Sequence, residues 1–361
     1  SSFFASRLPF FNFFRHSFSC SGVSGDKNVF KTHLKSFIDT FYVFARLCVL
    51  FPIYFFKVLL YNDHMIRKFN YRIEPEYDSF SIREYLSLKG YPNAVFVQLK
   101  KTPESVLLNG EWAYMRTRIS AGDELFIHLE ENTSSAHILP VSLPLSICYE
   151  DEDILAVDKP AYMPIHPSLN HYDHTLANAV CGYYNDQNIP YTFRCVNRLD
   201  RDTTGLTLIA KHMLSSAILS TAAARREISR EYIAIVSGKT PESGTIDAPI
   251  GRVDGSTIER QIDYKNGERA VTHYERLAYH DGLSLLSLHL ETGRTHQIRV
   301  HLKSIGHPLI GDFLYNPTDK TIKRQALHSY RLTFSHPITG GLLVLTAPLP
   351  DDMHCLFPDF F

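Results

Sequence analysis

The segment NRLDRDTTGL, residues 197–206, is the part of the chain from which the rest can be interpreted. It places one carboxylate, Asp200, between two guanidinium groups, Arg198 and Arg201. Nearby positive charge favours the ionised form of a carboxylate, so we expect Asp200 to be charged. Three residues suited to a tight turn follow: Thr203, Thr204 and Gly205. Such a turn would let a substrate approach the backbone closely. By itself the segment is equally compatible with a solvated charge cluster on a surface loop.

A second segment, LETGRTHQIRVHLKSIGHPLIGD at residues 290–312, predicts a helix that carries basic side chains. Thr295 can cap the helix, which continues over about ten residues until Gly306 closes it. Its apolar positions fall at i, i+4 and i+7: Ile298, Leu302 and Ile305. Arg299 and Lys303 are four residues apart, so both can face the same anion.

A third segment, REYIAIVSG at residues 230–238, predicts a strand. One face carries Tyr232, Ala234 and Val236, and the other carries Ile233 and Ile235. Further strand-like runs are ILAVDK, LTLIAK, AVTHYERLAY, LSLLSLHL and GLLVLTAPL. Helices are expected near residues 174–184, 213–226 and 295–305. Many strands with few helices predict an α+β domain built on a mixed, largely antiparallel sheet.

Together these segments resemble the pseudouridine synthases of the RluA type, over about residues 146–349. The resemblance includes DKPAYMPIHPS at 158–168 and ALHSYRLTFSHP at 326–337. Two positions depart from the family pattern, because Asn197 stands where many members carry His and Thr204 where Ser is frequent. Neither change removes a charge. The resemblance implies a central cleft across the sheet and site-specific isomerisation of uridine to pseudouridine in structured RNA.

The resemblance also assigns roles to individual residues. Asp200 is the expected catalytic carboxylate, and whether it attacks the ribose or the pyrimidine ring stays open. Arg299 is the expected ion-pair partner of this carboxylate. Tyr232 is expected to stack on the flipped base and move a proton, although an ordinary strand aromatic is the alternative. Expected substrate-binding residues are Arg198, Arg201, Thr203, Thr204, Gly205, Arg294, His296, Gln297 and Leu327. Among these, His296 is expected to brace the loop that carries Asp200.

Cofactors and metals are not expected. The chain has no G-x-G-x-x-G or P-loop pattern, so nucleotide cofactors have no evident site. His296 and His301 are five residues apart, which is not the i, i+4 spacing of a helical metal pair. The six cysteines are scattered without C-x-x-C pairing, which indicates a reducing compartment.

The charge balance is uneven along the chain. The formal net charge is −1, but residues 1–64 hold 7 Lys/Arg against 3 Asp/Glu, which leaves 30 against 35 for the remainder. A body with net negative charge must hold RNA phosphates through local patches. The candidate patches are Arg194, Arg198 and Arg201; Arg225, Arg226 and Arg230; and Arg294, Arg299 and Lys303.

Residues 1–64 differ in composition from the rest. Residues 1–25 are rich in Phe and Ser, contain Arg7 and Arg15 and lack acids, as transit peptides do. The apolar stretch at 36–61 is interrupted by charges and Pro52, so no membrane helix is expected. We expect Met65 to be the functional start and the enzyme to be a cytoplasmic monomer. An organellar location is the alternative if residues 1–25 act as a transit peptide.

A small α/β module is expected at residues 65–130, a linker at 131–144 and the catalytic domain at 145–361. The module has a helix at 81–90, an Asn-Gly hairpin turn in VLLNGEW and a closing strand at 121–130, which resembles an S4-type RNA-binding module. Its basic residues, Lys89, Lys100, Lys101, Arg116 and Arg118, could contact phosphate or form a solvated face. Trp112 is expected to pack in the core or a hinge and not to stack on bases.

Two other functional classes compete with this prediction. An S4-type RNA-binding protein without catalysis would not need Asp200 and Arg299, yet both are present. A glycoside hydrolase would need two carboxylates a few ångströms apart, and Asp202 is expected to point away from Asp200. The favoured substrate is large-subunit ribosomal RNA, with transfer RNA as the alternative.

Overall fold

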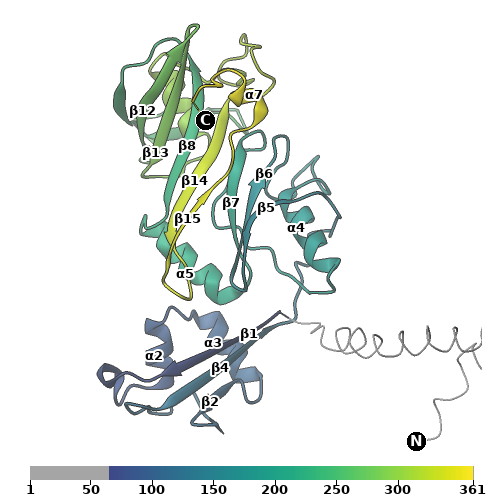
Figure 1. Ribbon diagram of the computed structural model, residues 1–361, viewed down its shortest axis with the longest axis vertical. Coiled ribbons are helices and arrows are strands. Elements are labelled where there is room, and N and C mark those ends of the chain that lie inside the picture. Colours follow the sequence, from purple (N-terminus) through teal and green to yellow (C-terminus); the bar gives the residue numbers. More distant parts are fainter. Residues whose placement is uncertain (1–64, 361) are drawn as a thin grey trace, which may run out of the picture. The chain divides into compact units, whose positions relative to one another are not determined.

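The computed structural model describes residues 65–360, and two separate sheets organise most of them (Figure 1). The smaller sheet has four antiparallel strands in the order β1-β4-β2-β3. Its strands are β1 (Met65–Arg72), β2 (Val106–Leu108), β3 (Glu111–Trp112) and β4 (Glu124–Glu131). The expectations for residues 1–64 lie outside the described residues.

Helices α2 (Ile82–Leu88) and α3 (Asn93–Lys101) pack on one face of the smaller sheet (Figure 1). The predicted helix is confirmed as α2. Ser81 begins it with a reciprocal capping box, and its apolar positions Ile82, Tyr85 and Leu86 are buried. Helix α3 was not predicted, because Pro92 and β-branched residues obscured a helix whose buried face is set by tertiary packing.

The Asn-Gly turn between β2 and β3 is confirmed, with positive φ at both Asn109 and Gly110. The expectation for Trp112 is wrong, because 54% of this residue is exposed. The neighbouring position explains the difference: Ala113, which follows Trp112 at the end of β3, turns into the core, so the Trp112 side chain turns outward.

The larger sheet has nine strands and confirms the predicted mixed, largely antiparallel α+β architecture. Eight of them follow the order β5-β6-β7-β14-β8-β13-β12-β9, and β15 pairs with the far half of β14. Strands β14 and β7 run parallel, and the other recorded pairs in this sheet run antiparallel. The strands are β5 (Ser146–Glu150), β6 (Ile154–Lys159), β7 (Thr204–Ala210), β8 (Ser229–Ser237), β9 (Ser243–Asp247), β12 (Val271–His280), β13 (Leu283–Leu290), β14 (Leu327–Ser335) and β15 (Leu342–Thr346).

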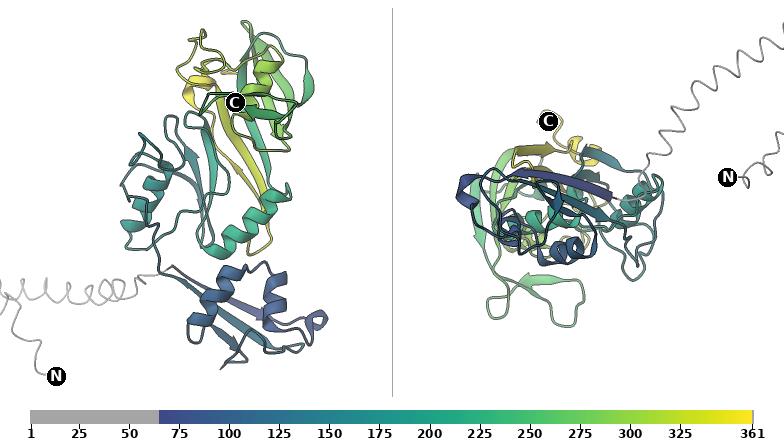
Figure 2. Two further views of the ribbon diagram at one scale, coloured as in Figure 1. Left: turned by 180° about the vertical axis from the view of Figure 1, so that it is seen from behind. Right: turned by 90° about the horizontal axis from the view of Figure 1, so that it is seen from below.

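Few other elements accompany the larger sheet. A separate hairpin, β10 (Ile250–Arg252) with β11 (Arg260–Ile262), projects from its side in the view from below (Figure 2). The helices are α4 (Leu176–Asn185), α5 (Met213–Ala224), α6 (Gln297–Ser304) and α7 (Asp351–His354), and a 3-10 helix, η2 (Pro75–Tyr77), precedes α2. Within residues 65–360, no helix is long and apolar enough to cross a bilayer.

Strand β8 is the central support of the functional site, and the predicted assignment of its faces is confirmed. Tyr232, Ala234 and Val236 join one buried cluster, which also receives the apolar face of α6. Ile233 and Ile235 join another cluster on the opposite face. Helix α6 is therefore held against the same side of the sheet that carries Tyr232.

Candidate active site

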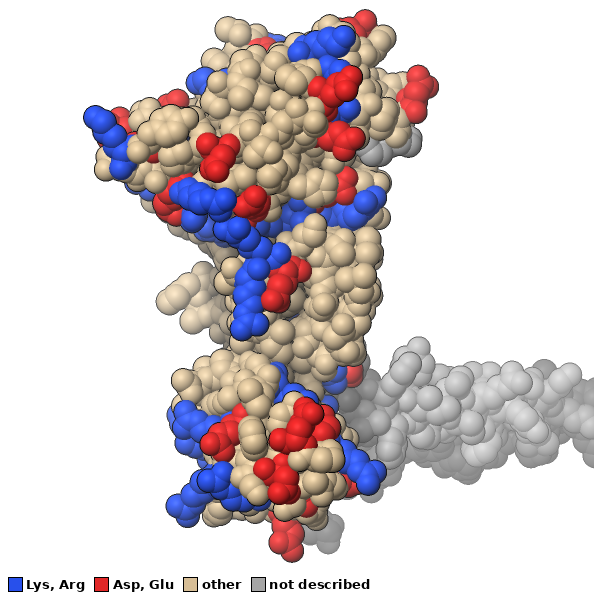
Figure 3. Space-filling model, turned by 90° about the vertical axis from the view of Figure 1, so that its left-hand side faces the viewer, with Lys and Arg blue, Asp and Glu red and all other residues tan. Residues whose placement is uncertain are grey.

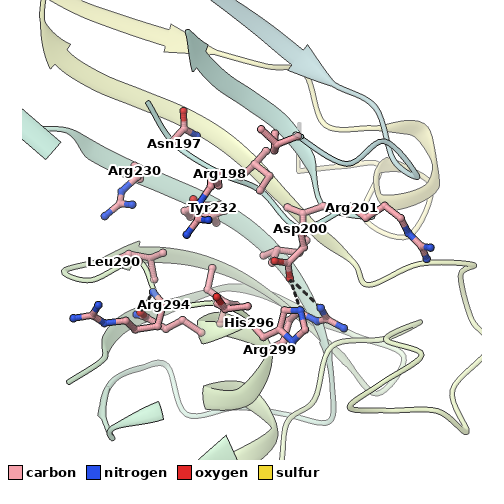
Figure 4. A pocket seen from close by; sticks show the side chains of 18 of the residues that line it. Asn197, Arg198, Asp200, Arg201, Arg230, Tyr232, Leu290, Arg294, His296 and Arg299 are labelled. Atoms are coloured by element: carbon pink, nitrogen blue, oxygen red, sulfur yellow. Dashed lines mark hydrogen bonds and ion pairs between the residues drawn. The ribbon is translucent and has the colours of Figure 1, made fainter. Parts of the chain in front are cut away.

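A cavity of about 430 Å³ lies where the segment before β7, strand β8 and helix α6 meet (Figure 4). Its volume falls within the range of roughly 300–1,000 Å³ that small-molecule sites occupy. Asp200 comes from the segment before β7, Tyr232 from β8 and Arg299 from α6. Segments about a hundred residues apart in the chain thus supply one site.

Arg299 holds Asp200 in place. Its Nη1 donates to Asp200 Oδ2 at 2.9 Å, while its Nε and Nη2 donate to the two oxygens of Asp312 at 2.7 and 2.9 Å. The Arg299 side chain is 3% exposed and that of Asp200 25% exposed. Burial opposes the charge of Arg299, but its hydrogen bonds to Asp312 and the two carboxylates raise its pKa overall. Asp312 was missed by the sequence analysis.

Arg201 does not flank Asp200 as the sequence order suggests. It donates twice to Asp202, at 2.8 Å each, and its side chain points away from Asp200 (Figure 4). Asp202 is buried and points away from the cavity, as expected. The charge partner of Asp200 therefore comes from α6 and not from its neighbour in sequence.

Two buried cations support the loop that carries Asp200, a role that the sequence analysis did not predict for either of them. Lys159 was expected at the rim of the cleft with a possible phosphate contact, and its complete burial shows that this expectation is wrong. Lys159 is fully buried, and its Nζ donates to the carbonyls of Pro160, Met163 and Arg201 at 2.8 to 2.9 Å. Burial lowers the pKa of Lys159 to about 7, although Asp202 and Asp200 act in the opposite direction. These hydrogen bonds are to main-chain oxygens, so no sequence pattern could predict them.

The second of these cations is Arg324, which is 2% exposed. Its Nη1 donates to the carbonyls of Leu327 at 3.2 Å and Gln325 at 3.0 Å and lies 3.4 Å from that of Asp202. Its Nε and Nη2 pair with the carboxylate of Asp352 at 2.7 Å. Arg324 therefore connects the end of the catalytic loop to the start of β14.

Tyr232 and Leu327 are buried and line the cavity beside Asp200. Burial raises the pKa of Tyr232, and the charge of Asp200 adds to this effect. The hydroxyl therefore keeps its proton at neutral pH.

His296 lies between Asp200 and the phenol of Tyr315. Its Nε2 is 3.8 Å from Asp200 Oδ2 and its Nδ1 is 2.9 Å from the Tyr315 hydroxyl. Burial lowers the pKa of His296, which keeps the ring neutral. The expectation that His296 braces the Asp200 loop stays a prediction, since the hydrogen-bond partner of the ring is Tyr315.

The start of α6 differs from the prediction. Thr295 is not the cap; the helix begins at Gln297, and His296 precedes it in the left-handed region with φ of 58°. Gln297 Oε1 instead accepts hydrogen bonds from the Arg294 backbone and the Thr292 hydroxyl. Gln297 is 3% exposed and lines the cavity. Within residues 65–360, the recorded hydrogen bonds of the Gln297 side chain join the start of α6 to the segment before it and to β12.

Thr203 lines the cavity, whereas Thr204 and Gly205 are not among the residues that line it. The Thr204 hydroxyl lies 2.9 Å from His328 Nδ1. Gly205 has φ of 106°, and a Cβ there would lie 2.3 Å from the Ser329 carbonyl oxygen. The close backbone approach at Gly205 is therefore made by strand β14, which pairs with it, and not by a substrate.

Three arginines, Arg198, Arg230 and Arg294, form what we call the rim of the cavity (Figure 4). Arg294 pairs with Glu268, but no ion pair is recorded within residues 65–360 for Arg198 or Arg230. The Nε of Arg230 is buried without a hydrogen-bond partner. On the face that Figure 3 shows, a band of Lys and Arg is broken by acids. Local basic patches fit this distribution better than a uniformly basic surface.

One group of residues outside the cavity has the spacing of metal ligands: Asp151, Asp153 and His336. Its oxygens are already engaged, because Arg67 donates twice to Asp153 and the Asp151 carboxylate accepts two backbone hydrogen bonds. A guanidinium inside the group opposes a second cation. The arrangement fits a structural ion network.

The cavity offers the chemistry of a single carboxylate. Asp200 is the only acidic residue among those that line it. Asp312 lies behind Arg299, fully buried, and its Oδ1 also accepts hydrogen bonds from the backbone of Leu314 and Tyr315. A two-carboxylate hydrolysis is therefore not supported by this geometry.

Comparison with known proteins gives a consistent result. Residues 153–304 match the family model described as RNA pseudouridylate synthase. The chain is 40% identical over 274 residues to the RNA pseudouridine synthase YjbO of Bacillus subtilis, covering 76% of this chain and 96% of that protein. It is 41% identical over 267 residues to YhcT of the same organism, covering 73% and 85%. It is 37% identical over 266 residues to ribosomal large subunit pseudouridine synthase D of Escherichia coli O157:H7, covering 69% and 81%.

Proposed function

This chain belongs to the RluA-type RNA pseudouridine synthases, isomerases that convert uridine to pseudouridine in RNA, and we propose that its target lies in large-subunit ribosomal RNA. Several of its relatives are named ribosomal large subunit pseudouridine synthase D, which supports this choice of RNA. The observation that carries the catalytic assignment is the pairing of Asp200 with Arg299 inside a cavity.

Asp200 is the catalytic carboxylate in this proposal. The target uridine leaves its stack, at a cost of a few kcal/mol, so that its C1′ and C5 become accessible. The bond between N1 and C1′ breaks and a bond between C5 and C1′ forms. C5 loses its proton and N1 gains one, so atoms and charge balance without an oxidant or a second substrate. A carboxylate held in place by Arg299 suits either attack on the uridine or stabilisation of the charge that develops.

Tyr232 and Leu327 form the surface on which the extruded base rests. Both are buried and line the cavity next to Asp200. The raised pKa of Tyr232 keeps its hydroxyl protonated, so the phenol would give its proton to N1 and then recover one from C5. His296, neutral and placed between Asp200 and Tyr315, positions the carboxylate without adding charge.

The rim arginines bind the phosphates next to the flipped uridine. Arg198 and Arg230 are the strongest candidates, since no carboxylate within residues 65–360 is recorded as their ion-pair partner. Phosphate accepts hydrogen bonds from guanidinium groups in the bidentate geometry that arginine offers. These contacts hold the RNA backbone in register and do not select a base.

Residues 65–130 serve as an S4-like RNA-binding module, joined by residues 131–144 to a catalytic domain at 145–361. Support comes from the order of elements, two helices followed by an Asn-Gly hairpin and a closing strand. The exposed cations Lys100, Arg116 and Arg118 lie together along a single groove of this region.

Pseudouridine mapping of total RNA, from cells with and without the gene, tests the choice of substrate. We expect the loss of modification at one or a few uridines of large-subunit ribosomal RNA. Loss confined to transfer RNA would replace ribosomal RNA by the alternative substrate. Release of free uracil, instead of an RNA of unchanged mass, would contradict isomerisation itself.

A further inference from the structure

A second hollow, which we call the aromatic groove, lies on the region of the four-stranded sheet, well away in sequence from the catalytic residues. Its volume is about 580 Å³, and Trp112 and Tyr114 form part of its wall. These two side chains are 54% and 63% exposed. Their rings stack on each other, with centroids 5.9 Å apart and planes inclined by 27°. A preformed pair of stacked rings therefore faces solvent.

The backbone imposes this arrangement. Ala113 and Met115 are buried in the core, whereas Trp112 at the end of β3 and Tyr114 and Arg116 in the segment that follows it are exposed. Two exposed aromatic rings and an exposed guanidinium therefore line one groove. Aromatic rings that stay exposed to water contribute little hydrophobic stabilisation to the fold. An exposed cluster of such rings is instead typical of an interaction site.

The charges around the groove select the kind of partner. Arg83, Lys100, Arg116 and Arg118 line it together with one acid, Glu84. Arg118 lies 3.4 Å from Glu84 in an exposed contact, and no ion pair is recorded within residues 65–360 for Lys100 or Arg116. An excess of cations beside aromatic rings is the pattern that binds unpaired nucleic acid, in which bases stack and phosphates meet Lys and Arg.

We propose that the aromatic groove binds unpaired nucleotides of the RNA substrate, with one base stacked on the Trp112–Tyr114 pair and the neighbouring phosphates held by Lys100 and Arg116. The inference rests on the proposed function only in taking RNA as the substrate. It assigns the module a contact with single-stranded RNA that is additional to the contacts around the modified uridine.

Trp112 is the only tryptophan of the chain, so tryptophan fluorescence, excited where tyrosine does not absorb, reports on the groove alone. In the free protein we expect emission of an exposed indole that acrylamide quenches readily. A short unpaired oligoribonucleotide should quench this emission at saturation and protect it from acrylamide, while a blunt RNA duplex of the same length should do so much less. An indole already shielded in the free protein would mean that another part of the chain or a second copy covers the groove, which overturns the proposal.

Variants of the full chain provide the second readout, binding of the same oligonucleotide measured by filter retention. Trp112→Ala and Tyr114→Ala should each weaken binding about tenfold, whereas Trp112→Phe should retain most of it because a ring is kept. Tyr264→Ala removes an aromatic side chain that is 79% exposed at another place and serves as the matched control. Binding unchanged in both alanine variants, or RNA bound without any change in emission, would overturn the inference.

Pseudouridine formation is measured separately on the same samples. Turnover without fluorescence quenching would leave the proposed function intact and remove the groove from RNA binding. Fluorescence quenching without turnover on any ribosomal RNA fragment would support RNA binding by the groove and contradict the proposed function.

Discussion

The floor and the rim of the catalytic cavity are built in opposite ways. We call Asp200, Arg299 and Asp312, with Lys159 beneath them, the floor. Every charged group of the floor is engaged by another part of the chain, through contacts of 2.7 to 2.9 Å. The rim arginines Arg198 and Arg230 carry charge with no recorded ion-pair partner in the described residues.

This difference separates two tasks. The floor has its geometry before RNA arrives, so its charges need little reorganisation during the reaction. The rim keeps its binding capacity for phosphates. Substitutions in the floor should therefore lower kcat, and substitutions in the rim should raise KM, which makes the comparison testable.

The largest effect is expected for Asp200→Asn. The amide keeps the shape of the side chain but removes the charge that acts on the uridine, so turnover should fall by ~10³-fold or more. Arg299 stays neutralised by Asp312, so the fold and RNA binding should survive. Single-turnover pseudouridine formation and RNA binding by filter retention measure the two properties. Measurable turnover in this variant would remove Asp200 from the chemistry.

Arg299→Met should abolish activity and also destabilise the protein. It leaves Asp312 buried and without its cation, which costs about 3–5 kcal/mol of unfolding free energy. The matched control is the double variant Arg299→Met with Asp312→Leu, in which no buried charge remains. We expect chemical denaturation to show recovery of much of the stability in the double variant, without recovery of activity. Recovered activity would show that Arg299 serves only the fold.

Lys159→Met tests whether the cation beneath the loop positions Asp200. Loss of three hydrogen bonds to main-chain oxygens should lower kcat by ~10- to 100-fold while KM changes little. In the wild type the pKa of Lys159 is lowered to about 7, so its ammonium loses a proton, and one of three donors, as the pH rises through that value. The wild-type kcat should therefore fall above about pH 7, and the profile of the variant should lack this limb.

The contribution of Lys159 to protein stability should rise with pH over the range in which kcat falls. In the unfolded chain Lys159 keeps its proton to its ordinary pKa of 10.5, whereas in the folded protein it loses it near 7. Between these values the unfolded state binds more protons, so this contribution to the unfolding free energy rises with pH. A Lys159→Met protein with an unchanged pH profile of kcat would contradict the positioning role.

The smallest effect is expected at the rim. Arg230→Ala should raise KM by on the order of tenfold and reduce the slope of log affinity against log salt by about one, because one phosphate contact is lost. Its kcat should stay close to that of the wild type. Lys239→Ala, an exposed cation beyond the far end of the same strand β8, is the control. A fall in kcat without a change in KM would place Arg230 in the floor.

The sequence predicted those features that depend on periodicity and local turn chemistry. The alternating faces of β8, the apolar face of α6 and the Asn109-Gly110 turn are all confirmed. These signals are local, since each follows from a repeat or from a residue that tolerates positive φ. The pairing of Asp200 with Arg299 lies beyond such signals and was reached only through the family resemblance.

Tertiary pairing accounts for the parts that the sequence analysis missed. Nothing in the order of residues showed that Arg201 would choose Asp202, or that Asp312 would share Arg299 with Asp200. Gly205 illustrates the same limit, because its freedom from a side chain is required by a strand that lies more than a hundred residues later. Trp112 was misjudged because burial was inferred from residue type and not from its position in the alternation.

The contact between Lys159 and the carbonyl of Arg201 has a consequence for how such a protein could change. The ammonium binds only main-chain carbonyl oxygens, so these hydrogen bonds do not depend on the side chains of the residues that accept them. Residues along this stretch can therefore be exchanged to suit a different RNA while the reactive acid keeps its place. A change of RNA target would then require substitutions only among the exposed side chains, while the position of the catalytic carboxylate stays the same.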